Sequence, residues 1–424
     1  MPIQQSRIAL SLLNLLLAAV QTGFGPFVSV WLTKQGWNQA DIGIALSVGT
    51  VAALLGQLPA GLLIDATPRK RLASGVALIV LAISALLLAL MPTWLAVLGA
   101  EILHGLASCA LVPAVAALTL SLVGHEAFGE QIGINARYAS IGNAAAAALL
   151  GVWATYLSQR GVLLLTAAMV LPALLALLAI PTQDLTKGAA ADAQAAKLLP
   201  KIHQPASEPS WHVVFERGFI GFALCALLFQ LANAALLPLA LNLYVAHDPA
   251  HEWVIFACII VPQFVVAGLS PWIGRISNIW GRRPILFLGL LALPLRAGII
   301  AFLPNALLLI PVQLLDGVSG AVFGLMLPLI AADVSRRIGC FNLSVGVFSL
   351  AGGLGATVST TLAGAIADAA GTRIAFLTLA AAGAAAVLLV GVAMPETRPA
   401  QRIRPADAAV QLDRASCGSG SWRA

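Results

Sequence analysis

The chain has 424 residues, of which 60% are hydrophobic and only 9% are charged, and its mean hydropathy is +0.95. Soluble domains carry about 25% charged residues, so this composition excludes a solvated surface and indicates a protein that crosses a lipid bilayer many times. The net charge of +6 does not indicate a nucleic-acid partner, because the basic residues lie in short segments beside apolar ones.

Twelve apolar segments follow one another along the chain. A hydrocarbon core of about 30 Å needs about 20 helical residues, and each segment has roughly that length or more. Inside lipid the backbone must satisfy its own hydrogen bonds, which favours helices. The predicted spans are 8–32, 42–64, 72–91, 94–123, 132–157, 162–180, 218–243, 253–277, 285–303, 306–332, 343–367 and 374–394.

Polar segments divide these spans into two groups of six. Residues 182–216 are rich in Ala, Lys, Gln and Pro and have no sustained apolar period, so we expect a cytoplasmic linker there. A similar polar tail covers residues 395–424. The expected protein is therefore all-α, with a six-helix bundle at 1–181 and a second at 217–394.

Lysine and arginine indicate the side of the membrane on which each polar segment lies. If the chain starts in the cytoplasm, eighteen of these residues fall on the cytoplasmic side and three on the outer side, namely Lys34, Arg160 and Arg373. Cytoplasmic loops of membrane proteins carry the excess of Lys and Arg. We therefore expect insertion in the inner membrane with both termini in the cytoplasm.

The two halves repeat each other in sequence. Three glycines of span five recur in span eleven, each 213 residues later: Gly133, Gly142 and Gly151, then Gly346, Gly355 and Gly364. Small residues let helices approach closely, so we expect these glycines to serve helix packing. Two bundles that arose by duplication are related by a pseudo-twofold axis, and transporters built this way bind their solute between the bundles near mid-membrane.

Two short loops share a further pattern. Residues 61–71 read GLLIDATPRKR, and residues 274–284 read GRISNIWGRRP. The pattern G-x-x-x-D-R-x-G-R-R/K is typical of the loop between helices two and three in the major facilitator superfamily, which the chain resembles over essentially its whole length. Ala66, Pro68 and Asn278 depart from it. The expected cytoplasmic gate residues are Gly61, Asp65, Arg69, Lys70, Gly274, Asn278, Arg282 and Arg283.

The resemblance implies that Asp65 faces the start of span eleven in the other half. A helix N-terminus carries a partial positive charge that a carboxylate stabilises, and Gly61 permits close approach of that helix. The loop would then be a latch between the halves, made and broken during transport. The alternative is a simple anchor of Arg69, Lys70 and Arg71 at the inner surface, which leaves Asp65 and Gly61 unexplained.

Span five bears on the direction of transport. Proton antiporters of the superfamily carry G-x8-G-x3-G-P-x2-G-G there. This chain keeps three of the glycines, whereas Ala146, Ala147 and Leu150 replace the remaining residues. The resemblance favours export, and uptake stays open because the proline is missing. Glu101 also stands where many members have an arginine, so an arginine-based coupling scheme does not carry over.

Helices one, four, seven and ten line the central cavity in the superfamily. The corresponding spans each carry a pair of polar residues, and three of the four pairs are spaced three residues apart, on one helix face. These pairs are Asn14 and Gln21, Glu101 and His104, Gln230 and Asn233, and Gln313 and Asp316. We expect them to contact the solute, and the alternative for the amides is bonding between helices, worth about 0.6–2 kcal/mol each.

Ionisable residues inside a membrane are costly and therefore indicate function. We expect Asp316 and Glu101 to load and release protons, with His104 assisting and Arg296 as the partner of Asp316. A static ion pair of Asp316 and Arg296 is the alternative. Arg137 either extends to the inner surface, which we favour, or binds an anionic substrate.

These patterns predict a secondary active transporter of a small organic solute that works by alternating access, is driven by a proton gradient and functions as a monomer. We expect no cofactor, because the sequence contains no GxxxxGK(S/T) loop. Export of a drug or metabolite is the first expectation, and proton-linked uptake of a metabolite is the alternative. An intramembrane enzyme or a receptor of the same fold is the remote alternative, and the sequence lacks the HExxH and GxSxG motifs.

Overall fold

The computed structural model describes residues 2–24, 26–67, 69–156, 158–185, 217–244, 253–335 and 340–398. The elements within these ranges are all helices. Most of the predicted linker at 182–216 and most of the predicted tail at 395–424 lie outside the described residues, as does Pro68 in the first of the two repeated loops.

The first half contains the first six spans. Its helices are α1 (Pro2–Thr22), α2 (Pro26–Lys34), α3 (Gln39–Ala66), α4 (Lys70–Leu90), α5 (Trp94–Tyr156) and α6 (Gln159–Leu178). Side chains cap two of them: Asn38 accepts the backbone N–H of Asp41 before α3, and Ser158 accepts that of Gly161 before α6.

Helix α5 joins the predicted fourth and fifth spans. It bends at Gly124, whose φ of 69° lies in the left-handed region that glycine adopts without strain because it has no side chain. Residues 124–131, which lie between the predicted fourth and fifth spans, are helical as well, because the helix resumes directly after this glycine. Eleven described helices are long and apolar enough to cross a membrane, and Trp94–Ala154 has 61 residues. That helix accounts for two crossings, which gives twelve.

The second half contains the other six spans. Its helices are α8 (Arg217–Asn233), α9 (Leu236–Tyr244), α10 (Trp253–Trp280), α11 (Arg282–Leu290), α12 (Ala292–Ile300), α13 (Leu309–Ser335), α14 (Phe341–Ala370) and α15 (Thr372–Val392). A short 3-10 turn, Ala306–Leu308, precedes α13. Helices α11 and α12 together make the ninth span.

The first span of each half is interrupted at a matching point. Helix α1 ends at Thr22, one residue after Gln21, and α8 ends at Asn233, which is 212 residues after Gln21 and 211 after Thr22. In the second half the free backbone N–H of Ala235 is bound by the hydroxyl of Ser359 from α14, at 3.2 Å. Discontinuous helices at mid-membrane are a recurring feature of transporter binding sites.

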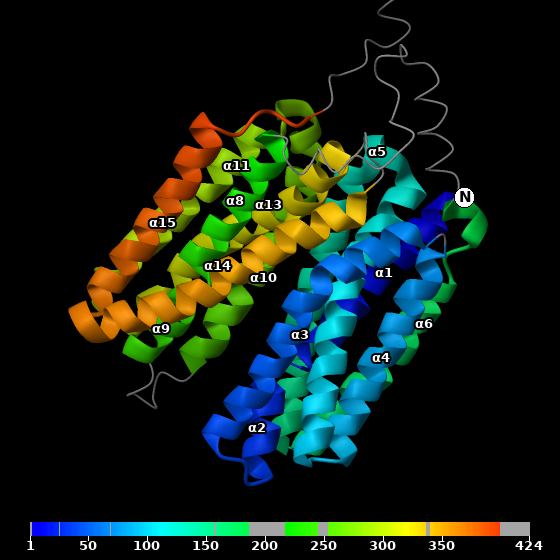
Figure 1. Cartoon of the computed structure of the whole chain (residues 1–424), viewed down its shortest axis with the longest axis horizontal. Coiled ribbons are helices and arrows are strands. Elements are labelled where there is room, and N and C mark those ends of the chain that lie inside the picture. The colour runs from blue at the N-terminus through cyan, green and yellow to red at the C-terminus, as the bar shows by residue number, and fades with distance from the viewer. Residues whose placement is uncertain are drawn as a thin grey trace, which may run out of the picture.

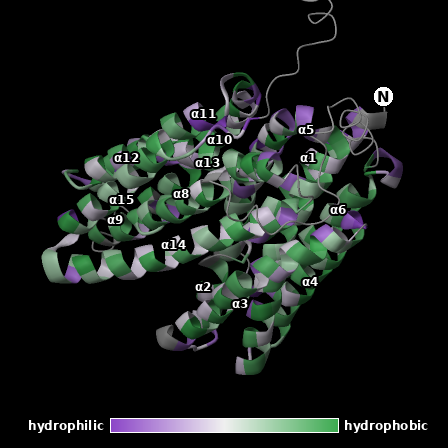
Figure 2. Ribbon diagram, turned by 45° about the horizontal axis from the view of Figure 1, so that its top comes forward, coloured by the Kyte–Doolittle hydropathy of each residue, from purple (hydrophilic) through white to green (hydrophobic). Residues whose placement is uncertain are grey.

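Each half has an apolar core, the core of the second half continues into the first through Ala116, Ala117, Phe128 and Ile132 of α5, and lipid-compatible side chains cover the outside. Leu55, Leu95 and Val392 are 73%, 81% and 84% exposed, and hydrophobic residues extend over most of the length of the helices (Figure 2). The two halves come together near the N-terminal end of α1 and diverge toward α2 and α9 (Figure 1). The contacts between the halves decide how this arrangement can move.

Candidate functional site

Arg296 on α12 is the centre of a polar network in the second half. Its guanidinium donates to Asp316 Oδ1 at 2.5 Å, Asn233 Oδ1 at 2.7 Å and Gln313 Oε1 at 2.8 Å. The side chain of Arg296 is 1% exposed, whereas that of Asp316 is 22% exposed. A charge removed from water needs such acceptors. The structure therefore brings these four candidates together on three helices.

This network still contains buried donors without an acceptor. The Nε of Arg296 and the Nε2 of Gln313 are buried and make no hydrogen bond within the described residues. A buried polar group without a partner costs about 1–3 kcal/mol. A water molecule or a solute oxygen bound beside Arg296 would remove that cost.

A second network lies in the first half, beside the break between α1 and α2. His104 Nε2 lies 3.2 Å from Gln21 Oε1, and the amide nitrogen of Gln21 donates to Ser108 Oγ at 3.0 Å. Phe24 stacks on the His104 ring with a centroid distance of 4.0 Å. Ser108 was not among the predicted residues, although its spacing of four from His104 places it on the same face.

Glu101 is separate from this network, although it lies only three residues before His104. It is 4% exposed and faces α3, where a Cβ on Gly49 would lie 2.6 Å from Glu101 Oε2. Because Gly49 has no side chain, α3 and α5 can enclose the carboxyl group. The two residues that were expected to act together therefore contact different helices.

Two of the predicted amides belong to neither network. Asn14 donates to the carbonyl of Leu10 on its own helix at 2.8 Å. Gln230 packs beside Gly352 of α14, where an added Cβ would lie 3.3 Å from Gln230 Cγ. Both side chains are half-buried. The spacing that suggested a shared face for Gln230 and Asn233 gives no shared hydrogen-bond partner among the residues that the structure describes.

Arg137 on α5 reaches across to the other half. Its Nε donates to the carbonyl of Ala267 on α10 at 2.9 Å. In a regular helix this carbonyl would accept the N–H of residue 271, but Pro271 has none. The proline therefore leaves an acceptor that Arg137 uses, a contact neither of the two sequence interpretations of Arg137 foresaw.

A buried polar chain in the first half was missed by the sequence analysis. Gln131 Nε2 donates to Asn135 Oδ1, and Asn135 Nδ2 donates to Thr119 Oγ1, both at 3.1 Å. None of the three is more than 3% exposed. The signal was present, since Gln131 and Asn135 are amides four residues apart at the boundary of the predicted fifth span. The chain ties the two arms of α5 together around the bend at Gly124.

The first repeated loop touches the start of α14. Asp65 Oδ1 accepts the backbone N–H of Asn342 at 3.0 Å and its side-chain amide at 2.7 Å, while Oδ2 accepts the N–H of Leu343 at 2.9 Å. These backbone groups belong to the first turn of the helix and have no partner within it. A Cβ on Gly61 would lie 2.7 Å from the carbonyl oxygen of Asn342, so glycine is needed for this approach.

The basic residues of this loop differ in their roles. Arg69 is exposed, and Lys70 is half-buried at the start of α4. Arg71 donates to the carbonyls of Leu178 and Ile180 at 3.0 and 2.8 Å, at the C-terminal end of α6. A cation stabilises that end of a helix. The base with the specific contacts is therefore Arg71, which was expected only to hold the loop at the membrane surface.

In the second repeated loop, the side chain of Arg282 is buried within its own half. Arg282 Nε lies 2.9 Å from Asp333 Oδ2, and both side chains are 5% exposed. The same guanidinium donates to Ser277 Oγ and Asn278 Oδ1, each at 2.9 Å. Asn278 thus binds within its own half, although its amide also lies against Gly129 of α5.

Residues at and after the C-terminal end of α15 bind Arg283 and the start of α11. Arg283 donates to the carbonyls of Val390 and Gly391 at the end of α15. The carboxylate of Glu396 accepts the backbone N–H groups of Arg282 and Arg283 at 2.8 and 3.1 Å. An acid at this position satisfies the free N–H groups of the helix start.

The six repeated glycines fall into two groups. A Cβ on Gly133, Gly142, Gly346 or Gly355 would collide with backbone atoms of a neighbouring helix, and Gly274 is similarly tight against Gly129. Gly151 and Gly364 instead have no heavy atom within 4 Å of an added Cβ. Both of these open positions lie toward the end of the molecule at which the halves diverge.

The chain can now be compared with known proteins. The family model of the Major Facilitator Superfamily matches residues 10–340 and 252–416. The chain belongs to this superfamily. An uncharacterized MFS-type transporter of Mycobacterium tuberculosis is 35% identical over 398 residues, which are 92% of this chain and 93% of that protein.

Solved structures of the superfamily share the fold. The Escherichia coli fucose:proton symporter has a TM-score of 0.70 at 16% identity over 92% of this chain and 98% of its own. A proton:xylose symporter has a TM-score of 0.71 at 14% identity over 93% of this chain and 96% of its own. The human organic anion transporter MFSD10 has a TM-score of 0.66 at 16% identity over 92% of this chain and 100% of its own. The prediction of two six-helix bundles of this superfamily is confirmed, and the chain is a transporter that crosses the membrane many times.

Proposed function

We propose that this transporter exports a small organic solute, a drug or a metabolite, in exchange for protons. It works as a monomer in the inner membrane, with both termini in the cytoplasm. The solute binds between the bundles at 1–181 and 217–394, and the loops that contain Gly61 and Gly274 open and close the cytoplasmic end. The proton gradient supplies the energy, and no cofactor takes part.

The observation that supports this proposal is the contact of Asp316 with Arg296. The side chain of Asp316 is partly exposed, whereas that of its partner Arg296 is buried. A proton bound to Asp316 would remove the negative charge that compensates Arg296, and the network would then have to rearrange. Such a rearrangement links proton binding to the shape of the solute site, because Asn233 belongs to the same network and ends the broken helix α8.

Glu101 and His104 are the corresponding groups in the first half. His104 lies beside the break in the first span, and Glu101 is enclosed between α3 and α5. An acid held against a helix that moves changes its surroundings when that helix moves. We assign Glu101 as a second proton-binding group, with His104 and Gln21 on the solute side.

The distribution of charges supports this orientation. The halves are joined at the end where Asp65, Arg275 and Arg282 lie, and Arg275 forms a bond of 2.8 Å with Glu130 across the halves. Basic loops lie on the cytoplasmic side. The divergent end would then face outward, and the described conformation would be one in which the cytoplasmic gate is closed.

Proton-linked uptake is the second candidate function. It is favoured by span five, where Ala146, Ala147 and Leu150 stand in place of residues of the antiporter pattern. Ala146 and Leu150 are buried at 1% or less, so they serve packing within the bundle. Both functions use the same site, and they differ in whether proton and solute move in opposite directions or together.

The test uses purified protein in liposomes that contain a pH-sensitive dye. Compounds from a solute library are first selected by thermal stabilisation, since a bound ligand raises the unfolding temperature. A selected compound is then loaded on one side, and counterflow of labelled compound is measured together with internal pH. Counterflow requires an alternating site, so its absence for every stabilising compound contradicts transport and favours the enzyme or receptor alternative.

The coupling group is tested by Asp316→Asn, with Asp368→Asn as its control. Asp368 is an exposed acid toward the end of α14. We expect the first variant to lose solute-driven pH change while it keeps counterflow, and the second to keep both. Unchanged pH movement in Asp316→Asn would remove this residue from the mechanism. The sign of the pH change separates export from uptake.

A further inference from the structure

Helices α5 and α10 meet along a seam between the two halves. A Cβ on Gly133 would collide with the backbone of Ser270, and one on Gly129 would lie 2.9 Å from the carbonyl oxygen of Gly274. Small residues permit this close approach of two membrane helices. The centre of the seam is therefore tightly packed, and larger side chains lie along its edges.

One edge of the seam faces lipid. On α10 this edge consists of residues spaced three or four apart, all of them exposed: Phe264, Gly268, Trp272, Arg275 and Ile279. Phe264 is 71% exposed and Trp272 is 58% exposed. In a chain that crosses the membrane many times, large apolar side chains exposed on a helix contact lipid, and tryptophan is typical of the membrane interface.

Arg137 of α5 lies on the same edge. Ile141 and Val152 follow it at helical spacing and are 45% and 59% exposed. The opposite side of α5 is packed within the first half, since a Cβ on Gly142 would collide with the backbone of Leu15 of α1. Arg137 is exposed as well, so its guanidinium is a charge on a surface that otherwise contacts lipid.

The charge of Arg137 has no anion beside it. Its Nε donates to the carbonyl of Ala267 at 2.9 Å, and its two terminal nitrogens make no hydrogen bond to the residues that the structure describes. Glu130 lies seven residues earlier, about 10 Å along the helix, and already pairs with Arg275 at 2.8 Å. A cation that faces lipid without a partner is costly. The described part of the chain supplies no carboxylate that would remove this cost.

The surface beside Ala267 is open. Gly268 is exposed, and an added Cβ there would have no heavy atom within 4 Å. Phe264 and Trp272 stand one turn to either side of this glycine, and both have large exposed side chains. Gly268 thus leaves an open position between two aromatic residues, next to the residue that binds Arg137.

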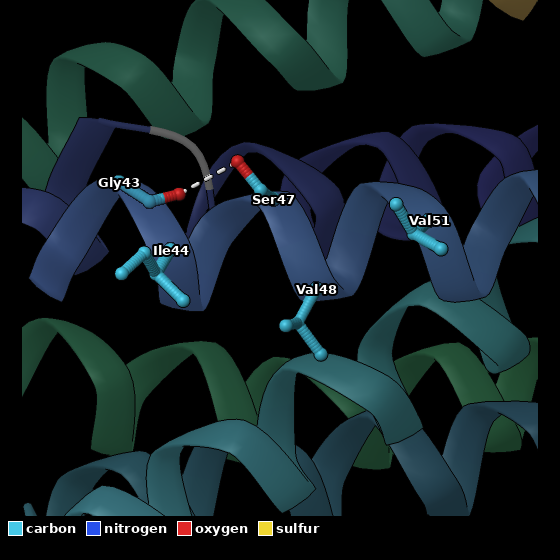
Figure 3. Close-up of a pocket in the computed structure, with 5 residues that line it drawn as sticks. All are labelled: Gly43, Ile44, Ser47, Val48 and Val51. Atoms are coloured by element: carbon cyan, nitrogen blue, oxygen red, sulfur yellow. Dashed lines mark hydrogen bonds between the residues drawn. The ribbon is translucent and has the colours of Figure 1, made fainter.

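The hollow on α3 differs in its chemistry. It has a volume of about 460 Å³ and is lined by Gly43, Ile44, Ser47, Val48 and Val51 (Figure 3). The hydroxyl of Ser47 donates to the carbonyl of Gly43 at 2.7 Å. None of these lining residues is charged, so they cannot select a charged headgroup. The edge of the α5–α10 seam combines an exposed apolar surface with an unpaired cation.

We propose that this edge binds one anionic phospholipid, with its phosphate on the terminal nitrogens of Arg137 and an acyl chain over Gly268, between Phe264 and Trp272. A guanidinium can bind phosphate through two parallel hydrogen bonds. Basic positions between membrane helices on the cytoplasmic side bind anionic headgroups in this way. The lipid is drawn a short distance inward to reach Arg137, and local thinning of a bilayer costs little for each ångström.

The bound lipid favours the state in which the two halves are joined. Arg137 and Gly268 belong to different halves, so the complete site exists only while α5 and α10 are together. A ligand that binds one conformation better shifts the equilibrium toward that conformation. The orientation proposed above assigns this lipid to the cytoplasmic leaflet, whereas the binding itself does not depend on transport.

The first test measures lipid binding to the purified full chain in detergent by native mass spectrometry. We expect the affinity for the first bound phosphatidylglycerol to be about tenfold higher than that for phosphatidylcholine, because the choline cation opposes Arg137. Equal affinities would overturn the proposal. An excess of glycerol 3-phosphate should leave the lipid bound, and its displacement would show a site for phosphate alone and contradict a lipid site.

Arg137→Gln should lower the affinity for phosphatidylglycerol about tenfold, because it removes the charge that binds the phosphate. Arg69→Gln is the matched control, since it removes the same charge from an exposed position in a basic loop. We expect less than about a twofold change in the control. Similar losses in both variants would mean that the basic surface as a whole attracts the lipid, which contradicts a site at Arg137.

Gly268→Leu tests the position of the acyl chain and leaves Arg137 in place. The new side chain would fill the open position, so the affinity for phosphatidylglycerol should fall about fivefold. Gly298→Leu is the control, because an added Cβ there also has no heavy atom within 4 Å but lies on α12. An unchanged affinity in Gly268→Leu would show that no chain lies over this glycine.

Hydrogen exchange tests whether the lipid favours the joined state. The peptide of residues 341–345 is suitable, because Asp65 binds its N–H groups in that state and it lies on α14, not at the lipid site. Bilayers of phosphatidylcholine with about 30% phosphatidylglycerol should slow its exchange about threefold compared with phosphatidylcholine alone. Gly268→Leu should abolish this difference and Gly298→Leu should keep it. No difference in the unaltered protein would contradict the link to the joined state.

These measurements need no solute, so they separate this inference from the proposed function. Selective lipid binding that depends on Arg137, without counterflow of any stabilising compound, supports the lipid site and contradicts transport. Counterflow without a preference for phosphatidylglycerol supports transport and contradicts the lipid site.

Discussion

The two repeated loops have nearly the same sequence pattern and opposite behaviour. In the first, Asp65 leaves its own half and binds the first turn of α14, and Arg69 stays exposed. In the second, Asn278 accepts a bond from Arg282 of its own half, and Arg282 is buried against Asp333. Asp65 of the first loop therefore joins the halves, whereas Asn278 and Arg282 of the second loop bind within their own half. The second loop meets the first half instead through Arg275, which pairs with Glu130.

The difference follows from where the opposing helix begins. Helix α14 begins at Phe341, so the N–H groups of Asn342 and Leu343 have no partner in the helix and attract a carboxylate. The residue opposite Asn278 is Gly129, which lies within α5, five residues after the bend at Gly124. Its N–H is already bonded in the helix. An amide is sufficient there because no free helix end requires an anion.

The largest effect is expected for Arg282→Ala. Loss of the guanidinium leaves the buried carboxylate of Asp333 without its cation, and breaking such a pair costs about 3–5 kcal/mol. The equivalent change in the first loop, Arg69→Ala, should alter stability by about 0.5 kcal/mol or less, because that side chain is exposed. Unfolding of the purified variants in detergent measures both, and a similar loss in both variants would contradict the comparison.

Asp65→Ala should have the next largest effect. It removes three hydrogen bonds to α14, two of them from backbone N–H groups, and we expect about 2 kcal/mol less stability for the joined state. Hydrogen exchange of the peptide that contains residues 341–345 reports this directly. Asn278→Ala is the matched control, and it should leave that peptide protected.

A smaller effect is expected at Cys340, the residue before α14. Burial and the nearby Asp65 carboxylate both raise the pKa of its thiol. Asp65→Asn removes one of these causes, so the pKa falls and more thiolate is present at pH 7. The rate of maleimide labelling of Cys340 should increase about twofold to tenfold, since the thiolate is the reactive form. A slower rate would show that the carboxylate does not act on this thiol.

The smallest effect is expected for Asn278→Asp, which gives the second loop the acid of the first. The new charge would lie beside Arg282, which already has Asp333, and would meet no free helix end. Stability should change by about 0.5 kcal/mol or less. A new dependence of cross-half contacts on this acid, seen as stronger protection of α5 in hydrogen exchange, would show that an acid at position 278 can bind the opposite half as Asp65 does.

The sequence predicted the number of crossings and the position of several contacts. Apolar length identified all twelve spans, and the glycine offsets identified the tight positions Gly133 and Gly346. The expectation that Asp65 faces the start of span eleven matches the bonds it makes. Its role as a latch in transport stays a prediction.

Other features depend on geometry that spacing does not contain. Glu101 and His104 share a helix face, yet one meets α3 and the other meets Gln21, because the face borders two neighbouring helices. Residues 124–131, between two predicted spans, are helical, because a single positive φ at Gly124 is enough to turn the helix. A sequence pattern gives the side of a helix on which a residue lies, and the neighbours on that side come only from the packing.

Pro271 has a consequence for how firmly the two bundles adhere. Its missing N–H frees the Ala267 carbonyl, and Arg137 of the opposite bundle occupies it. With an ordinary residue at 271, α10 would bond to itself and compete with Arg137 for the same oxygen. The strength of this cross-bundle bond is therefore set by an imino acid inside one helix, and Pro271→Ala would weaken it while both bonded residues remain in place.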